Sequence, residues 1–237
     1  MKSTIIVIPA YQPDRELLAV LAQLAQLCRS KMIVVNDGSD SSYEPLFSRA
    51  AEYPLVEVLS HPENMGKGTA LRTGFKYVLE SELTAATVVT ADADGQHRPE
   101  DICRVSAACV NHPDTLILGA REFSGRVPLR SRLGNGLTRW LYNMLFKQNL
   151  SDTQTGLRGI PVNVLASILT LTGGRYSYEL EMLLLLNQLQ LPVMEIPIST
   201  VYENNNSSSH FRPLRDSLQI YQTLFRWWWN NGRSQFL

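Results

Sequence analysis

The fold is decided by the stretch TVVTADADGQ at residues 87–96. Its first four residues are β-branched, which is typical of a strand, and the polar run Asp92–Gln96 follows one residue later. Three other strand patterns precede polar clusters in the same way: Thr4–Ile8 before residues 9–11, Met32–Val35 before 36–39, and Val56–Leu59 before 64–68. A helical pattern at residues 17–28 separates the first two strands, and another at residues 70–79 separates the last two. The sequence therefore predicts parallel βαβ units whose carboxyl ends, with the four clusters, share one edge of a sheet.

The second half of the chain is less regular. Strand patterns occur at Leu116–Ala120 and Val193–Ile198, and a loop rich in Gly, Pro and Arg is expected at Arg121–Arg132. Helical patterns occur at residues 133–144, Tyr178–Leu189 and 214–228. We expect an α/β domain over residues 1–210, with a mainly parallel sheet flanked by helices. A C-terminal amphipathic helix and tail are expected over residues 211–237.

The composition excludes several classes of protein. Of the 237 residues, 44% are hydrophobic and 19% are charged, which is typical of a folded domain rather than a disordered chain. The chain has 22 basic residues (Lys plus Arg) and 22 acidic ones (Asp plus Glu), so its net charge is zero. No overall charge attracts nucleic acid, and we do not expect nucleic acid as a partner. The strand at Thr4 begins too early for a signal peptide, and no apolar run approaches the roughly 18 residues of a membrane span.

The three cysteines, Cys28, Cys103 and Cys109, are odd in number and show no CxxC spacing. This pattern fits a reducing compartment better than a framework of disulfides. We therefore expect all three to be small buried side chains of a cytoplasmic protein.

Asp92 and Asp94 are the strongest chemical signal. Side chains two apart in an extended segment point to the same side, so both carboxylates can face one ion, and Gln96 adds a third oxygen. Hard oxygen ligands favour Mg²⁺ or Mn²⁺, which share their remaining positions with water and substrate phosphates. A solvated acidic turn is the alternative, but the three neighbouring clusters favour the metal.

The clusters at residues 36–39 and 64–68 each have a simple structural alternative. Residues 36–39 are suited to a tight turn, which is the structural interpretation. The functional interpretation is that Asp37 accepts hydrogen bonds from a nucleobase. Residues 64–68 lead into a helix, whose unpaired N–H groups and dipole attract an anion, with Lys67 beside it. The alternative is a helix start shaped by glycine, with Lys67 in solvent. The spacing of a P-loop is absent, which argues against phosphoryl transfer by that route.

Several motifs stand in a fixed order along the chain. They are Ile8-Pro-Ala-Tyr11, Val34-Val-Asn-Asp-Gly-Ser39, Asn64-Met-Gly-Lys-Gly68 with Gly74, Asp92-Ala-Asp-Gly-Gln96 and Gly119-Ala-Arg121. The series resembles inverting family 2 glycosyltransferases, which have the GT-A fold. Two further motifs, Ser151-Asp-Thr-Gln-Thr-Gly156 and Tyr178-Glu-Leu-Glu181, are similar to the subgroup related to dolichyl-phosphate mannosyltransferase, which glycosylates polyprenyl phosphates. The match runs from Thr4 to about Val201.

The resemblance implies a transferase that takes a sugar from a nucleotide-diphosphate donor with Mg²⁺ or Mn²⁺ as cofactor. Position by position, it implies nucleotide contacts by Pro9, Tyr11 and Asp37, metal ligation by Asp92, Asp94 and Gln96, and contacts of Arg121 and Arg132 with donor or acceptor phosphates. Arginine suits phosphate because its forked donors match the oxygens, although a solvated surface is the alternative for an arginine-rich loop.

Two positions depart from the family pattern. Gln12-Pro13 replaces the usual Asn-Glu after the first tyrosine, which removes an acidic nucleotide contact unless Asp14 supplies it. Asn36 stands where the family usually has the first of two aspartates, and the second aspartate is present as Asp37.

Glu179 and Glu181 lie two residues apart on a predicted helix. Such side chains point about 200° apart, so both face one site only if the helix begins between them. A capping role is the alternative for this pair.

The acceptor decides which residues act in catalysis. A lipid phosphate is already anionic near neutral pH, so positioning, the metal at Asp94 and the charge of Arg121 would be sufficient. A hydroxyl of a glycan or of a teichoic-type polymer needs a base, for which Asp152 is the candidate. A nucleotidyltransferase would carry a basic Gly-rich loop after the first strand, where Pro9-Ala-Tyr11 stands. A non-catalytic nucleotide-sugar binding module would have a damaged metal site.

The last helical pattern ends in the aromatic run Phe225-Arg-Trp-Trp-Trp229, with Arg226 and Arg233 nearby. This composition suits the interface of a bilayer, which would make the protein peripheral on the inner face of the cell membrane. The alternative is a helix that packs on the core or on a second copy of the chain, as in a homodimer.

Overall fold

The computed structural model describes residues 3–121, 129–146, 148–173, 175–199 and 221–229, with side chains for all of these except residues 129–135, 137, 175 and 176. The remaining part of the chain includes residues 200–220, which contain the predicted boundary between domain and C-terminal helix at 210. Arg132 lies in a described helix, but its side chain is outside the described part, as is the whole of Arg233.

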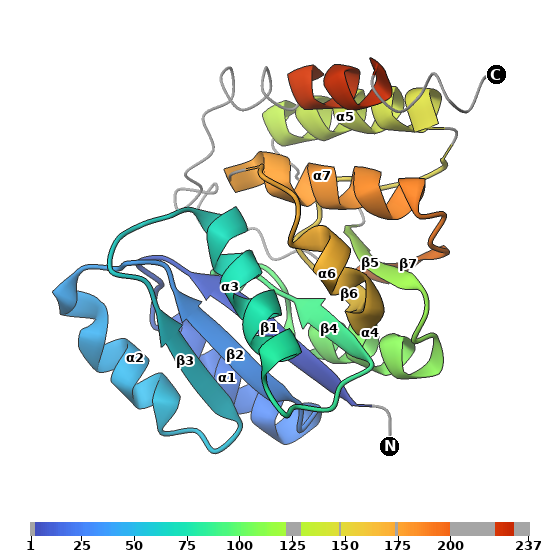
Figure 1. Ribbon diagram of the computed structural model, residues 1–237. Helices are drawn as coiled ribbons and strands as arrows, with labels where there is room; N and C mark the ends of the chain where they lie inside the picture. Colours follow the sequence, from blue (N-terminus) through green and yellow to red (C-terminus); the bar gives the residue numbers. More distant parts are fainter. Residues whose placement is uncertain (1–2, 122–128, 147, 174, 200–220, 230–237) are drawn as a thin grey trace.

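A seven-stranded sheet runs through the molecule in the order β3-β2-β1-β4-β6-β5-β7 (Figure 1). Neighbouring strands are parallel except β6, which is antiparallel to both β4 and β5. The carboxyl ends of the other strands therefore face one edge. The strands are β1 Thr4–Ala10, β2 Lys31–Asn36, β3 Val56–Ser60, β4 Thr87–Thr90, β5 Leu116–Arg121, β6 Arg158–Pro161 and β7 Val193–Ile198.

Helices cover both faces of the sheet because its strands are apolar on both sides. In β1, Ile6 and Ile8 pack in one hydrophobic cluster, and Ile5 and Val7 pack in the other. The first cluster includes residues of α1 (Glu16–Leu27), α2 (Glu44–Ala51) and α4 (Pro99–Asn111). The second includes residues of α3 (Lys67–Glu80), α6 (Leu165–Ile168) and α7 (Arg175–Gln188). Short 3₁₀ turns are η1 (Ser41–Tyr43) and η2 (Val162–Val164).

Two further helices lie beyond α7, at the top of Figure 1. They are α5 (Leu129–Phe146) and a helix over residues 221–229. Tyr142 of α5 and Leu224 of the last helix are buried in the same hydrophobic cluster as α7. The C-terminal helix thus packs on the core through one face. Among the described residues, no helix has the length and apolarity that crossing a bilayer requires.

The expected α/β architecture is confirmed, and each predicted strand agrees with the observed one to within two residues at either end. Four elements, α2, α4, α6 and β6, were not predicted from the sequence pattern. The pattern also predicted a loop as far as Arg132, whereas α5 begins at Leu129. The sequence of β6, Arg-Gly-Ile-Pro, is poor in strand formers, and this strand exists because two neighbours pair with it.

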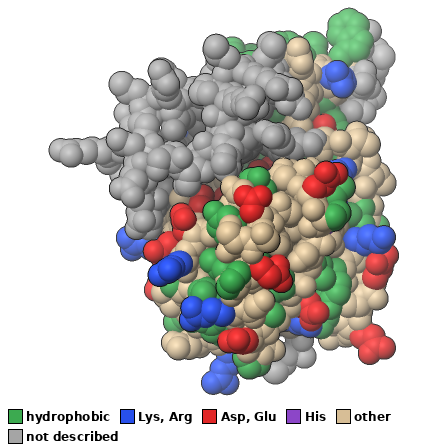
Figure 2. Space-filling view, turned by 90° about the vertical axis from the view of Figure 1, so that its left-hand side faces the viewer, with side chains coloured by type: hydrophobic (Ala, Val, Ile, Leu, Met, Phe, Trp, Pro, Cys, Tyr) green, Lys and Arg blue, Asp and Glu red, His purple; other side chains and the backbone are tan. Residues whose placement is uncertain are grey.

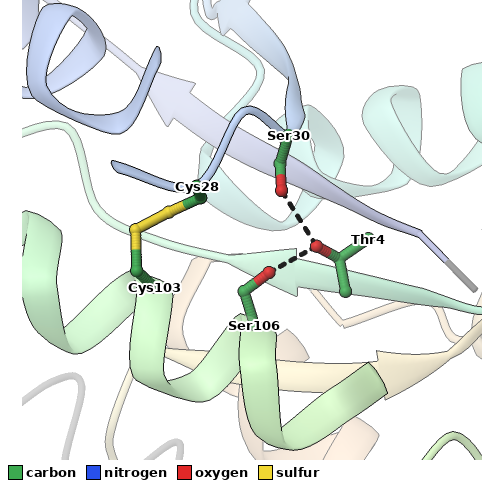
Figure 3. The surroundings of a disulfide bond; sticks show 5 residues. All are labelled: Thr4, Cys28, Ser30, Cys103 and Ser106. Atoms are coloured by element: carbon green, nitrogen blue, oxygen red, sulfur yellow. Dashed lines mark hydrogen bonds between the residues drawn. A yellow bond between two sulfur atoms is a disulfide. The ribbon is translucent and has the colours of Figure 1, made fainter. Parts of the chain in front are cut away.

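Cys28, directly after α1, and Cys103 on α4 form a disulfide, with their Cα atoms 5.6 Å apart (Figure 3). The expectation of unpaired cysteines is therefore wrong for this pair, whereas Cys109 is free and buried as expected. The two cysteines are 75 residues apart in sequence and meet because α1 and α4 pack against each other. A crosslink over such a separation stabilises a fold by about 4 kcal/mol in the chain-entropy model.

Candidate active site

The loop after β4 carries the predicted metal ligands at the carboxyl edge of the sheet. It is folded by local hydrogen bonds: Asp92 N donates to His97 Nδ1 (3.2 Å), and Gln96 N donates to Asp94 Oδ1 (3.1 Å). Asp92, Asp94 and Gln96 therefore lie together in one tight turn. Two carboxylates and an amide oxygen on such a turn match the hard ligands that Mg²⁺ and Mn²⁺ prefer.

Lys67 joins this loop to the opposite side of the site. Its Nζ lies 2.6 Å from Asp92 Oδ1 and 3.0 Å from Glu179 Oε1 of α7. Burial alone would raise the pKa of Asp92, but the neighbouring ammonium lowers it to about 2. Burial would likewise lower the pKa of Lys67, and the charges of Asp92 and Glu179 outweigh it and raise that pKa. Asp92 and Lys67 are therefore both charged near neutral pH.

Asp94 has a different environment. Burial, followed by the negative charge of Asp92, raises the pKa of this carboxyl. Among the described residues, no Lys, Arg or His nitrogen lies within 4.0 Å of it. Asp94 is exposed at the rim, so a cation from solvent can reach it, and its negative charge beside that of Asp92 favours a divalent ion there.

Asp37 is buried and bonds to the loop before α3. Its Oδ1 accepts from Met65 N (3.0 Å) and lies 2.8 Å from His61 Nδ1, and its Oδ2 accepts from Gly66 N (2.8 Å). Gly66 has a φ of 91°, which strongly favours glycine. Asp37 therefore fixes the backbone from which Lys67 projects. Its predicted contact with a nucleobase stays a prediction.

The turn after β1 lies beside the turn after β2. Gln12 N donates to Ser39 Oγ (2.8 Å), and Gln12 Nε2 donates to Asp40 Oδ2 (2.9 Å). Gln12, one of the two departures from the family pattern, thus ties the first two rim clusters together. Pro9 is buried at the end of β1, and Tyr11 is 37% exposed on the rim.

Arg121, at the end of β5, forms a two-pronged ion pair with Asp152. Its Nε lies 2.6 Å from Asp152 Oδ2 and its Nη2 lies 3.0 Å from Oδ1. Asp152 is fully buried; burial would raise its pKa, but the hydrogen bonds and charge of Arg121 lower it. Glu195 of β7 accepts the backbone N–H groups of Ser151 and Asp152. Asp152 is held as an anion that orients Arg121.

Arg158 is a buried cation that the sequence analysis did not single out. Its guanidinium donates to the carbonyl oxygens of Thr155 (2.9 Å), Glu179 (2.5 Å) and Thr153 (3.4 Å). It therefore binds the loop before β6 to α7 and fixes the backbone of Glu179. No sequence signal distinguishes it from a surface arginine, because its role depends on contacts between distant segments.

Glu179 and Glu181 point to different places, because α7 begins at Arg175, before both of them. Glu179 faces Lys67, whereas Glu181 Oε2 accepts from Gly173 N (2.9 Å), just before the helix. Only Glu179 belongs to the site. Glu181 does not cap the helix, because it lies in the second turn of α7, and it binds the segment before that helix instead.

The protein has a mainly parallel α/β sheet with a carboxylate pair, a lysine and an arginine at its carboxyl edge. This combination is typical of nucleotide-sugar transferases with the GT-A fold. The model of the family "Glycosyl transferase family 2" matches residues 5–168. The chain belongs to this family and is a glycosyltransferase.

Similar proteins act on lipid-linked phosphates according to their names. The chain is 30% identical to UDP-N-acetylglucosamine–dolichyl-phosphate N-acetylglucosaminyltransferase of Methanococcus voltae, over 83% of this chain and 85% of that protein. It is also 30% identical to undecaprenyl-phosphate mannosyltransferase of Micrococcus luteus, over 82% of each chain.

A solved structure has the same fold. Glucosyl-3-phosphoglycerate synthase of Mycobacterium tuberculosis, in complex with Mn²⁺, UDP and glucosyl-3-phosphoglycerate, superposes with a TM-score of 0.72 at 17% identity. The match covers 95% of this chain and 80% of that one.

Gly156 tests the geometry around Asp92. A Cβ at this position would lie 2.6 Å from Asp92 Oδ2, so Gly156→Ala should displace that carboxylate and lower transferase activity by about tenfold or more. The matched control is Gly136→Ala on α5, where a Cβ meets nothing within 4 Å. We expect the control to retain activity. Equal initial rates for both variants would contradict the packing of Gly156 against Asp92.

Proposed function

We propose that this chain is a metal-dependent, inverting glycosyltransferase that moves a sugar from a nucleotide-diphosphate sugar to a polyprenyl phosphate. The observation that carries the proposal is Asp94, a carboxylate beside Asp92 that has no cationic partner within 4.0 Å among the described residues. A divalent cation held by Asp92, Asp94 and Gln96 would stabilise the negative charge that develops on the departing diphosphate.

The residues around this loop have separate roles in the proposal. Pro9 and Tyr11 contact the nucleotide, as the resemblance implies, with Asp37 shaping the rim beside them. Lys67 and Arg121 contribute positive charge toward the diphosphate, and Arg132 remains a candidate for a phosphate contact. In the reaction, an acceptor oxygen forms a bond to the anomeric carbon while the bond from that carbon to the diphosphate breaks. A single displacement of this kind inverts the configuration.

The state of Asp152 favours a phosphate acceptor. Both of its carboxylate oxygens are bound by Arg121, so accepting a proton from a hydroxyl would require breaking a buried ion pair. A phosphate oxygen is already anionic and needs no such base. The names of the relatives, a dolichyl-phosphate and an undecaprenyl-phosphate transferase, support the same choice.

A transfer screen tests the enzyme directly. UDP- and GDP-sugars are incubated with the protein, Mn²⁺ or Mg²⁺, and polyprenyl phosphate, and release of the nucleoside diphosphate is measured. We expect transfer by the wild type, loss of activity on chelation, and a decrease of about 100-fold or more in Asp94→Ala.

The matched control for this screen is Asp114→Ala, because Asp114 is exposed between α4 and β5, away from the carboxyl edge. This variant should keep wild-type rates. Transfer that survives chelation, or equal activity of the two variants, would contradict the metal-dependent mechanism.

A surface at one end of the molecule fits the interface of a membrane. Trp140 and Met144 of α5 and Phe225 and Trp229 of the last helix are each more than half exposed, and we call these four residues the aromatic patch. At the upper right of Figure 2, hydrophobic side chains project beside a basic one. We propose that the patch rests on the cytoplasmic face of a membrane, beside which a lipid-linked acceptor is within reach.

Liposome flotation tests this contact. The triple variant Trp140→Ser, Phe225→Ser, Trp229→Ser should partition about tenfold less into vesicles containing phosphatidylglycerol, because three large apolar side chains no longer enter the interface. The control is Leu27→Ser with Val110→Ser, which alters exposed apolar residues outside the patch and should leave flotation unchanged. Equal flotation of the triple variant and the wild type would rule out the patch as the membrane contact.

A further inference from the structure

Three carboxylates lie around the metal loop and the start of α3. Asp92, Asp94 and Glu179 supply these carboxylates, and the ammonium of Lys67 bridges two of them at 2.6 and 3.0 Å. Lys67 thus holds Asp92 in the same way that a bound cation would. Asp94 is left for a second positive charge.

The partners of Lys67 are fixed, whereas its own side chain is not. Glu179 is buried, and Arg158 holds its backbone carbonyl. Asp92 is part of the tight turn after β4. The side chain of Lys67 has a longer flexible stem than that of Asp92 or Glu179, so it is the member of the trio that can move.

The base of that side chain is held in place. Lys67 is the first residue of α3, and Asp37 binds the backbone N–H groups of Met65 and Gly66 just before it. The ammonium can therefore swing from Asp92 toward a ligand at the start of α3, where the positive end of the helix dipole attracts phosphate.

A divalent cation at Asp92 and Asp94 would meet the ammonium of Lys67 at close range. Two positive charges beside one carboxylate repel each other, and the repulsion is strong in a partly buried site. A diphosphate relieves it, because its negative charge binds both the metal and the displaced ammonium.

We propose that Lys67 occupies the metal-binding carboxylate in the donor-free protein and moves to the diphosphate when the metal and the donor bind together. This inference rests on the proposed function. Its consequence is that the metal binds weakly alone and tightly with a nucleoside diphosphate, so that Lys67 couples the two binding events. A lysine with a merely structural role would support metal binding instead, and its removal would weaken it.

The test is a Mn²⁺ titration of the donor-free protein, followed by the electron paramagnetic resonance of free Mn²⁺. Lys67→Met should bind Mn²⁺ about tenfold more tightly than the wild type, because the competing ammonium is gone. Lys67→Arg keeps the charge and should bind Mn²⁺ weakly, like the wild type. Addition of UDP or GDP should tighten Mn²⁺ binding in the wild type much more than in Lys67→Met.

Thermal unfolding provides a second readout in case Lys67→Met is destabilised by its two unpaired carboxylates. Mn²⁺ alone should raise the melting temperature of Lys67→Met, or of the more polar Lys67→Gln, by more than it raises that of the wild type. If Lys67→Met and Lys67→Gln both bind Mn²⁺ no more tightly than the wild type does, the proposal is overturned.

Asp94→Ala separates this inference from the proposed function. If Asp94→Ala still binds Mn²⁺ as the wild type does, the metal site itself is wrong and the proposed function fails with it. If Asp94→Ala loses Mn²⁺ but Lys67→Met shows no gain, only the role of Lys67 is wrong.

Discussion

The ion pairs of Lys67 are the interaction on which the candidate site depends. Asp92 comes from the loop after β4, Glu179 from α7 and Lys67 from the start of α3, so one ammonium joins three separate parts of the fold. Partly buried carboxylates are tolerated only with compensation, and this pairing therefore constrains how α3 and α7 lie against the sheet. The same constraint explains why Gly156, whose Cβ would touch Asp92, has no side chain.

The surrounding residues support this arrangement through the backbone. Asp37 holds the N–H groups before Lys67, and Arg158 holds the carbonyl of Glu179 together with the loop before β6. Asp152 fixes Arg121 by a buried two-pronged ion pair. Polar residues that suggest direct contact with a ligand thus act partly by positioning other residues of the site.

The sequence predicts most of the sheet, because each of the first four strands is a short run rich in Val, Ile or Thr that is followed by a turn cluster. It did not lead us to predict α4, although Pro99 with two acidic residues after it is a recognisable helix start. It misses β6, the disulfide and Arg158, since all three depend on contacts between residues far apart in the chain. The positions of Asp152 and Arg121 along the chain do not show that their side chains pair. The pairing depends on how the segments that carry them come together in the fold.

The most direct test of the account is a crystal structure of the protein with Mn²⁺ and a nucleoside diphosphate, with Mn²⁺ located by its anomalous scattering. We predict an anomalous peak in contact with Asp92 and Asp94, and Lys67 Nζ moved from Asp92 to a phosphate oxygen. A peak elsewhere, or an intact pair of Lys67 and Asp92 with the metal bound away from both aspartates, would contradict it.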